Sequence, residues 1–373
     1  MEYSTYKPLY EQIFEDLKTQ INAGHYPIGE KLPPEKTLMG TYKVSRITVQ
    51  KAVNLLASEG IVTRRAGVGT TVLKKTELSP HKKMLGAILP GILESFGAKL
   101  LIGLTDAAAK KGYPLIIKFS GEDEDQENQC LQELLDAHVK GIFINPLQRS
   151  FYDPLLMQLI LKKFPVVVID KQLVGIDEVF AGTNHLASAR QLAQQISALG
   201  HQNICVIGYH DVSNSTLAIR QEAFSQVYAT TDYPLKASAF AHIIETTYAH
   251  HDGKNALAED IQRIKDCIMT NKPTCLIVLD SYIGSLVREA TMEMGLSVPL
   301  DIGIAGFDPN NDIIRSVRYT CIVQDEEAIA ASAVDLMTKI LTNKPLANRT
   351  VKLPSRYIDY GTVVNRGLMH VIP

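Results

Sequence analysis

The sequence predicts a small winged helix-turn-helix domain joined to a larger, two-lobed α/β domain. Three observations support this fold class. The first 84 residues hold 13 lysines and arginines against 8 acidic residues, whereas the rest of the chain is acidic. A polar stretch, KKTELSPHKK, separates two regions with apolar periodicity. Beyond it, strand-like and helix-like segments alternate. We therefore place the first domain at 1–74, a linker at 75–83 and the second domain at 84–373.

Composition limits the class of protein. Of the 373 residues, 46% are hydrophobic and 21% are charged, which excludes disorder over most of the chain. No stretch reaches about 18 uninterrupted apolar residues and no export signal is present, so we expect a cytoplasmic protein with no membrane span. The net charge of −2 divides into +5 for the first 84 residues and −7 for the rest. This division suggests that only the first part meets a polyanion, although a chance imbalance of surface charges would look the same.

The cysteines indicate neither disulfides nor a metal site. They are five in number, widely scattered, and form no CxxC pair. Most lie in apolar, strand-like segments, where cysteine usually fills space in a core. We therefore expect no metal and no cofactor.

The first domain contains the pattern of a helix, a helix-turn-helix and a hairpin. Apolar residues recur every four positions over 9–21, and a second short helix begins at Pro34-Glu35. Ser45 is expected to cap a third helix, which Gly60 ends. Two short strands, 61–64 and 70–73, follow around a glycine-containing tip.

The third helix has one apolar face and one polar face. Arg46, Gln50 and Asn54 lie opposite the apolar stripe, so this helix can enter the major groove of DNA. Placement and charge add four candidate DNA contacts, namely Ser45, Thr48, Lys51 and Arg65. The tip sequence GVG is an ordinary hairpin turn in the alternative interpretation, and a dinucleotide loop is disfavoured because a third glycine and a following helix are missing.

These segments resemble the GntR family of winged-helix regulators over about the first 75 residues. The matching motifs are PLYEQI, AGHYPIGEKLPPEKTL, VSRITVQKAVNLLASEGIV and RRAGVGTTV. The resemblance implies that Lys36, Arg46, Gln50 and the wing tip at Gly67 contact operator DNA. Two residues depart from the family pattern: Lys43 stands where glycine is usual, and Gln50 stands where arginine is frequent. Glutamine can read adenine where arginine reads guanine, so the operator preference should shift accordingly.

The larger domain is predicted to contain two consecutive α/β sets, the second beginning with the strand FAGTN. Ligands of such sheets bind beyond the carboxyl ends of the strands. This rule brings a set of strand-end residues toward one cleft: Pro90, Lys118, Asn145, Asp170, Lys171, Tyr209, Asp280 and Asp308. Their polar side chains suit a small polyhydroxylated ligand.

The body resembles the sensor domain of LacI/GalR regulators, which is built like the periplasmic sugar-binding proteins. Its landmarks include FPVVVIDK, RQEAF and GIAGFD. The resemblance implies that Arg220, Asp280 and Asp308 bind the effector, and Lys171 and Gln324 match cleft or interlobe positions more weakly. For Arg220 the alternative is an ion pair with an acid elsewhere. Phe96 either stacks on a sugar ring or belongs to the core.

A GntR-type domain joined to a LacI-type sensor resembles the group of arabinose-responsive repressors. The resemblance implies a homodimer that binds operator DNA and releases it when a sugar binds, with L-arabinose as the first candidate. Two alternatives remain. An enzyme acting on sugars or nucleotides is disfavoured because the sequence has no phosphate loop and no HExxH or GxSxG motif. A transport binding protein is disfavoured because it would have no use for the N-terminal domain.

Overall fold

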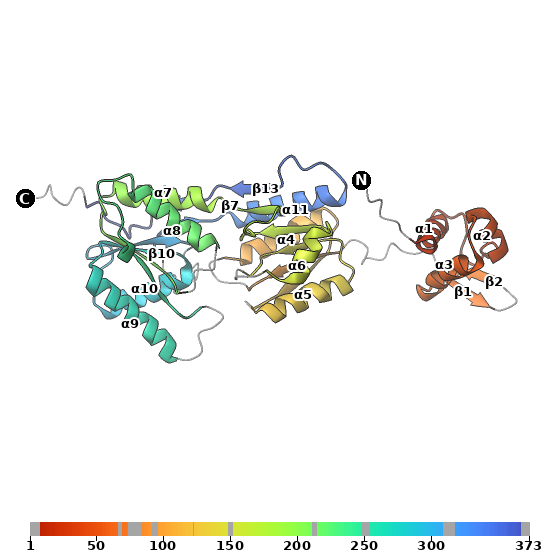
Figure 1. The fold of residues 1–373 in the computed structure, drawn as a ribbon, viewed down its shortest axis with the longest axis horizontal. Helices are drawn as coiled ribbons and strands as arrows, with labels where there is room; N and C mark the ends of the chain where they lie inside the picture. The colour runs from red at the N-terminus through yellow and green to blue at the C-terminus, as the bar shows by residue number, and fades with distance from the viewer. Residues whose placement is uncertain are drawn as a thin grey trace, which may run out of the picture. The chain divides into compact units, whose positions relative to one another are not determined.

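The structure is a computed structural model, and it describes residues 8–65, 69–73, 84–91, 96–121, 123–147, 152–210, 215–247, 254–308 and 318–366. The chain divides into two compact units, Met1–Lys82 and Lys83–Pro373 (Figure 1). The stretch predicted as a linker, 75–83, lies outside the described residues. Each unit has its own buried core.

The smaller unit is a three-helix domain with a β-hairpin. Its elements are α1 (Leu9–Asn22), α2 (Glu35–Tyr42), α3 (Arg46–Ser58), β1 (Val62–Arg65) and β2 (Gly69–Val72). The predicted apolar stripe of α3 is buried, and α3 packs on both α1 and α2. Leu17, Ile21 and Leu56 are fully buried in this core, and each such side chain contributes about 1.5–3 kcal/mol by leaving water.

The turn between α2 and α3 has a left-handed residue at Lys43, the position where the GntR family usually has glycine. Lys43 ends α2 with φ 52° and ψ 45°, the left-handed region where glycine is favoured. A lysine there costs about 1 kcal/mol, which the packed helices on both sides tolerate. Ser45 caps α3 as predicted, because its hydroxyl accepts the backbone N–H of Thr48 at 3.3 Å.

The larger unit has two lobes, each built on a six-stranded sheet. The first lobe contains β3 (Leu85–Leu89), α4 (Ala98–Lys110), β4 (Leu115–Phe119), α5 (Glu124–Asp136), β5 (Ile142–Ile144), α6 (Pro154–Leu161), β6 (Val166–Ile169), β7 (Phe180–Thr183), α11 (Glu326–Leu341) and β13 (Thr350–Leu353). Its strand order is β13-β7-β6-β5-β3-β4, and every pair is parallel.

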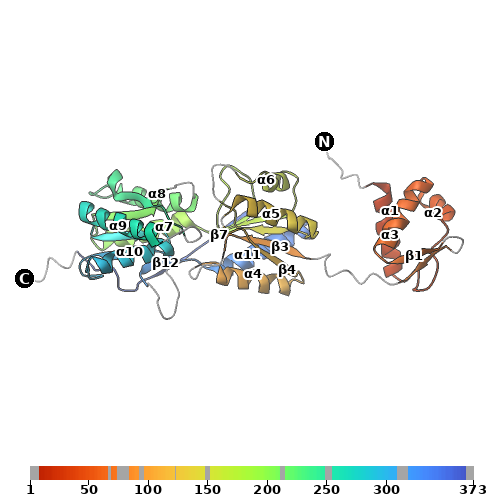
Figure 2. The same ribbon diagram turned by 90° about the horizontal axis from the view of Figure 1, so that it is seen from below.

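The first-lobe sheet is covered on both faces. One buried cluster joins α4 and α11 to the sheet, and a second joins α5 and α6 to it. Figure 2 shows these two helix pairs on opposite sides of the strands. Neighbouring residues of β6 alternate between the two clusters, which is why its sequence VVVI is apolar throughout.

The second lobe contains α7 (His185–Ala198), β8 (Ile204–Tyr209), α8 (Ser215–Tyr228), β9 (Phe240–Ile244), α9 (Lys254–Asn271), β10 (Cys275–Val278), α10 (Ser281–Glu293), β11 (Gly303–Phe307), β12 (Thr320–Val323) and β14 (Arg356–Ile358). The strand order is β14-β12-β11-β10-β8-β9, with only β14 antiparallel. The five cysteines are buried and unbridged, as expected for core residues.

The prediction of an α/β body with two lobes is confirmed, but the prediction of two consecutive sets is wrong. FAGTN forms β7, which pairs with β6 in the first lobe rather than opening the second. The chain then builds most of the second lobe, returns for α11 and β13, and crosses again to β14. Three crossings therefore join the lobes, after β7, after β12 and after β13. Apolar periodicity identifies strands but does not say which sheet they join, because every buried parallel strand has the same pattern.

Candidate functional site

On the exposed face of α3, the candidate side chains Arg46 and Gln50 meet one carboxylate, which also binds an arginine of β1. Glu35, the first residue of α2, accepts Arg46 Nε at 3.2 Å and Gln50 Nε2 at 3.1 Å on its Oε2 atom. Its Oε1 atom accepts Arg64 Nη2 from β1 at 2.5 Å. Arg64 also donates to Asn54 of α3. The predicted pair Arg46 and Gln50 is therefore brought together, and Glu35 and Arg64 were missed by the sequence reasoning.

The other predicted residues of this domain lie around that group. Ser45 caps α3, and its hydroxyl lies 2.8 Å from the hydroxyl of Thr48. The Lys51 Nζ atom lies 5.6 Å from the centre of the Tyr10 ring on α1, apart from Glu35. Lys36 and Arg65 are exposed at the start of α2 and the end of β1. Gly67 lies outside the described residues.

Ile47 adds an apolar feature to the polar face of α3. It is 67% exposed, although isoleucine is usually buried. An exposed aliphatic side chain beside Arg46 and Gln50 can contact the methyl group of thymine, while the polar side chains bond base edges or phosphates. The pattern of apolar residues gave no signal for Ile47, because it lies outside the buried stripe.

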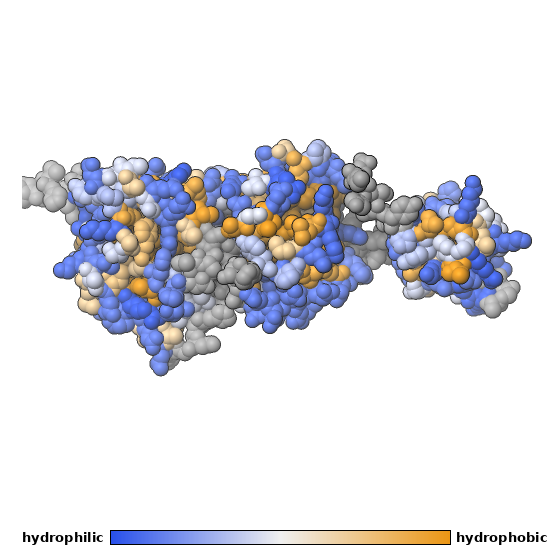
Figure 3. Space-filling model, viewed as in Figure 1, coloured by the Kyte–Doolittle hydropathy of each residue, from blue (hydrophilic) through white to orange (hydrophobic). Residues whose placement is uncertain are grey.

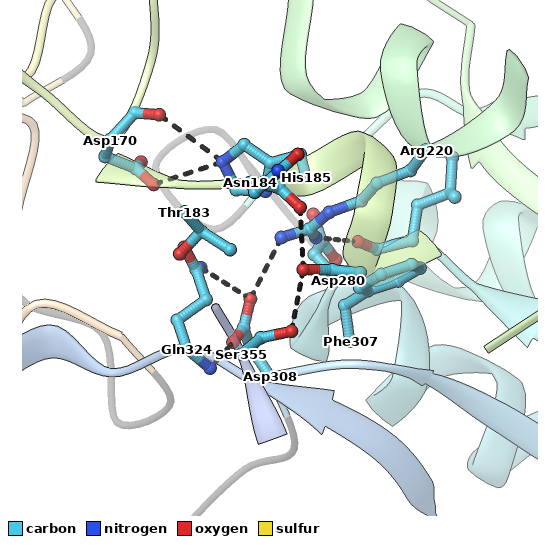
Figure 4. Close-up of polar contacts among 12 residues, drawn as sticks. Asp170, Thr183, Asn184, His185, Arg220, Asp280, Phe307, Asp308, Gln324 and Ser355 are labelled. Atoms are coloured by element: carbon cyan, nitrogen blue, oxygen red, sulfur yellow. Dashed lines mark hydrogen bonds and ion pairs between the residues drawn. The ribbon is translucent and has the colours of Figure 1, made fainter. Parts of the chain in front are cut away.

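In the larger unit, the functional cluster is centred on Arg220 of α8 (Figure 4). Its side chain is almost fully buried, with Nη1 donating to the carbonyl of Leu279 at 2.5 Å and Nη2 donating to Asp308 at 3.2 Å. The guanidinium lies 4.2 Å from the centre of the Phe307 ring. Among the described residues, Arg220 Nε has no hydrogen-bond partner although it is buried. A buried N–H without a partner is costly, so this atom is available for a ligand.

Asp308 connects Arg220 to the crossings between the lobes. It follows β11 with φ 47°, a left-handed conformation that turns its carboxylate into the cluster. Its Oδ2 atom also accepts Gln324 Nε2 at 2.9 Å. Gln324 follows β12, and its Oε1 atom accepts the Thr183 hydroxyl, at the end of β7, at 2.7 Å. Two crossings thus meet Arg220 through one hydrogen-bonded chain.

Asp280 lies in the same neighbourhood but serves a structural contact as well. Its Oδ1 atom caps α10 by accepting Ile283 N at 2.9 Å, and its Oδ2 atom accepts the Tyr209 hydroxyl at 2.8 Å. Burial raises the pKa of Asp280, and these two hydrogen bonds and the Arg220 charge oppose the rise. Asp280 can therefore bind a ligand only while it also accepts hydrogen bonds from Ile283 N and the Tyr209 hydroxyl.

The first lobe contributes Asp170 and its partners. Asp170 has φ 65° after β6 and accepts Asn145 Nδ2 at 3.2 Å. Burial raises its pKa to about 6, while the charges of Lys171 and Arg220 oppose the rise. His185, the first residue of α7, places Nε2 3.4 Å from the Asp170 carbonyl. Asn145 Oδ1 is buried without a hydrogen-bond partner among the described residues, so it too can accept a ligand hydroxyl.

Two predicted effector residues do not join this cluster. Lys118 of β4 pairs with Glu133 of α5, and this contact raises the pKa of the lysine. Phe96 packs against the buried cluster between the first-lobe sheet and α4 and α11. Lys118 therefore forms a surface ion pair, and Phe96 belongs to the core, which is one of the two alternatives that the sequence left open. Neither contact supports a role with an effector.

The chemistry of the cluster is that of a polar binding site. It offers a guanidinium, three carboxylates, two amides and a hydroxyl, which together can donate to and accept from several hydroxyl groups. Among the described residues, no group of three or more histidine, cysteine or acidic side chains is close enough to hold a metal ion. In the same part of the chain, every helix is too short or too polar to cross a membrane.

Both units resemble known protein families. Residues 9–72 match the family of bacterial regulatory proteins of the GntR type, and residues 86–345 match the periplasmic binding protein domain. The arabinose metabolism transcriptional repressor of Geobacillus stearothermophilus is 22% identical, with 90% of this chain and 92% of that protein covered.

Solved structures show the same architecture in the larger unit. Transcription regulator CcpA of Lactococcus lactis has a TM-score of 0.65 at 18% identity and covers 76% of this chain and 99% of its own. A LacI family transcriptional regulator from Enterococcus faecium, solved with bound ribose, has a TM-score of 0.59 at 20% identity with the same coverage. The chain belongs to the periplasmic binding protein domain family, carries a GntR-type DNA-binding domain, and is a transcription regulator rather than an enzyme.

Proposed function

We propose that this protein is a repressor that binds operator DNA through α3 and the β1-β2 wing and releases it when a small sugar binds at the Arg220 cluster. The observation that supports the sugar site is the buried Arg220, which is held by Asp308 and stacked on Phe307, and whose Nε has no hydrogen-bond partner among the residues that the structure describes. A sugar hydroxyl can accept from Nε and donate to Asp308, which satisfies both groups. This role places the protein in the cytoplasm, where operator DNA is found.

L-Arabinose is the first candidate effector. The arabinose repressor of G. stearothermophilus aligns over both units, and the E. faecium regulator with a similar sensor fold was solved with ribose. Both names point to five-carbon sugars. A pentose carries several hydroxyl groups that can pair with Arg220 and Asp308, so we expect pentoses to bind more tightly than disaccharides.

The repressor is proposed to act as a homodimer on a near-palindromic site, because one winged helix contacts few bases. Large hydrophobic side chains are exposed on the larger unit, and Figure 3 shows hydrophobic residues gathered on the first lobe. Surfaces of this kind often bind a second subunit. The large hydrophobic side chains exposed on the first lobe are Ile102, Phe119, Leu161 and Val174. Light scattering should give twice the monomer mass at micromolar concentration, and a monomer that still binds the complete operator contradicts this model.

Release of DNA requires that the sugar bind one arrangement of the lobes better than the other. The chain from Arg220 through Asp308 and Gln324 to Thr183 gives a physical basis for this difference, because it joins the cluster to two crossings. A coupling free energy of about 1–3 kcal/mol changes operator affinity about 5- to 150-fold.

The test is fluorescence anisotropy of labelled operator duplexes, obtained by binding-site selection, with pentoses, hexoses and disaccharides added in turn. Wild type should lose operator affinity with a pentose. R220K keeps the charge but loses the planar fork and the stacking on Phe307, so calorimetry should show at least about tenfold weaker sugar binding. Its affinity for the operator without sugar should be unchanged.

Arg190 provides a matched control for R220K. It is an exposed residue on α7 of the same lobe and donates to Gln226 at 2.6 Å, apart from the cluster. R190K should bind sugar and release DNA as wild type does. Operator affinity that no sugar alters would contradict the proposed induction, whereas equal loss in R190K and R220K would contradict the assignment of Arg220.

A further inference from the structure

The smaller unit places a carboxylate among side chains that should meet a polyanion. Glu35 is 25% exposed in its side chain and accepts from Arg46, Gln50 and Arg64, which come from α3 and β1. A negative charge at this position repels phosphates, so it weakens general attraction to DNA. The N-terminus of α2 favours the charge at this position. The three side chains that donate to Glu35 indicate that the carboxylate orients them.

The contact with Glu35 fixes the orientation of the Gln50 amide. A carboxylate only accepts hydrogen bonds, so Gln50 must turn Nε2 toward it, as the 3.1 Å contact shows. One N–H and the Oε1 atom then remain for DNA. This pair matches the N7 acceptor and N6 donor of adenine in the major groove. With the amide turned over, the nitrogen and oxygen would exchange places, and the match would be lost.

The same carboxylate also orients two arginines. Arg46 uses Nε on Glu35, so its terminal nitrogens stay available, and its side chain is 70% exposed. Arg64 gives Nη2 to Glu35 and Nη1 to Asn54, so both terminal nitrogens are occupied within the protein. Arg64 therefore acts as a brace that holds Glu35 against α3, and Arg46 is presented as a directed donor.

We propose that Glu35 is a positioning residue that sets the base preference of Gln50 and Arg46 and, through its charge, disfavours DNA of the wrong sequence. The inference rests on the proposed binding of α3 to operator DNA. The proposal predicts opposite changes in base discrimination and in affinity for unrelated DNA, whereas loss of a direct DNA contact would lower both. Loss of Glu35 should weaken discrimination between bases while it strengthens binding to unrelated DNA.

The experiment compares full-length wild type with E35Q, E35D and Q50A by selection from randomised duplexes. Anisotropy is then measured with the selected duplex, single-base variants of it and a scrambled duplex, at several salt concentrations. Q50A identifies the position that Gln50 reads. E15Q is the matched control. Glu15 is an exposed acid on α1, outside α2 and α3, and E15Q changes the net charge by the same amount as E35Q.

For E35Q we expect discrimination at the Gln50 position to fall about tenfold, within the range of one bidentate contact. Affinity for the scrambled duplex should rise about two- to fivefold. E35D keeps the charge but shortens the reach, so it should lose discrimination without the gain on scrambled DNA. E15Q should retain the wild-type base preference.

Two results would overturn the inference. One is an E35Q or E35D protein that keeps the full wild-type preference at the Gln50 position, and the other is a fall in affinity for selected and scrambled DNA by the same factor. Thermal unfolding of each variant shows whether the domain is intact, and E35D tests the idea if E35Q does not fold. A wild-type protein that selects no sequence contradicts the proposed function instead, because that result does not involve Glu35.

Discussion

At the scale of single residues, burial shifts the pKa values of two groups of the Arg220 cluster, Asp170 and His185, in opposite directions. Burial raises the pKa of Asp170 to about 6 and lowers the pKa of His185 to about 3. The charge of Arg220 lowers both pKa values. It offsets part of the rise at Asp170 and adds to the fall at His185. At neutral pH His185 is uncharged, and Asp170 is an anion that the folded protein holds at a cost. Their effects on stability oppose each other between pH 4 and 6.

Replacing Asp170 by asparagine should isolate one of these effects. The folded-state pKa of Asp170, about 6, exceeds its usual value of 3.8, so ionisation weakens the native state progressively as the pH rises from about 4 to 6. D170N lacks this loss. The unfolding free energy of D170N minus that of wild type should therefore grow across this window, by at most about 3 kcal/mol, and stay constant above it. Denaturant titrations between pH 4 and 8 measure the difference.

Asp177 supplies the control for that comparison. Its side chain is 88% exposed in the same lobe, so D177N should show a difference from wild type that stays small and flat over the same pH range. If the D170N difference shrank as the pH rose, the Asp170 carboxylate would be stabilised by Lys171 and Arg220 rather than penalised by burial. The comparison cancels His185, which is present in every protein measured.

The sequence identified the centre of the cluster but not its links. Arg220, Asp308 and Gln324 came from a family resemblance and from the rule that ligands bind beyond strand ends, and the structure joins them. Thr183 and Glu35 gave no signal. Thr183 meets Gln324 across 141 positions, and Glu35 meets Arg64 across 29, so only the folded chain shows these pairs.

At the scale of elements, sequence patterns located the three helices of the smaller unit to within a few residues. Side-chain caps like the one that Ser45 gives α3 also mark helix starts in the larger unit. Asn184, Asp280 and Asp325 each accept a backbone N–H at the start of α7, α10 and α11. The same patterns failed on connectivity, because FAGTN, which forms β7 in the first lobe, was predicted to begin a second set. Sheet membership depends on which strand edges remain open when the chain returns, and local patterns do not contain that information.

The crossings between the lobes make a prediction at this scale. T183V removes the hydroxyl that donates to Gln324 and leaves the size of the side chain nearly unchanged. One hydrogen bond contributes about 0.5–1.5 kcal/mol, so the fall in operator affinity caused by sugar should shrink about two- to tenfold. Sugar affinity should change less, because the Thr183 hydroxyl bonds Gln324 and not the charged groups of Arg220 and Asp308. Paired calorimetry and anisotropy titrations distinguish the two quantities.

Thr342 serves as the matched substitution for T183V. It is an exposed residue at the end of α11 whose hydroxyl bonds only its own helix. T342V should leave both sugar affinity and DNA release unchanged. If T183V released DNA as fully as wild type, the chain from Arg220 to the crossings would be structural and would not transmit the effect of the sugar.

At the scale of the whole molecule, the charge differs between the two compact units. The basic N-terminal unit holds α3 and the wing, and the acidic larger unit holds the Arg220 cluster. Each unit has a separate hydrophobic core. Separate cores predict separate unfolding, because each unit can lose its packing without exposing the core of the other.

Differential scanning calorimetry of the full-length protein should therefore show two transitions, each sensitive to a different ligand. Sugar at about one hundred times its dissociation constant adds about 2.7 kcal/mol to the native larger unit, which should raise its Tm by roughly 5 °C. The smaller transition should stay in place with sugar and rise with operator duplex. At the same sugar concentration, R220K should keep at most about half of the response to sugar, as expected for tenfold weaker binding, and should keep the whole response to DNA. A single transition that both ligands shift equally would show instead that the two units unfold as one cooperative structure, and coupling between sugar and DNA would then arise from shared stability rather than from the hydrogen-bonded chain at the crossings.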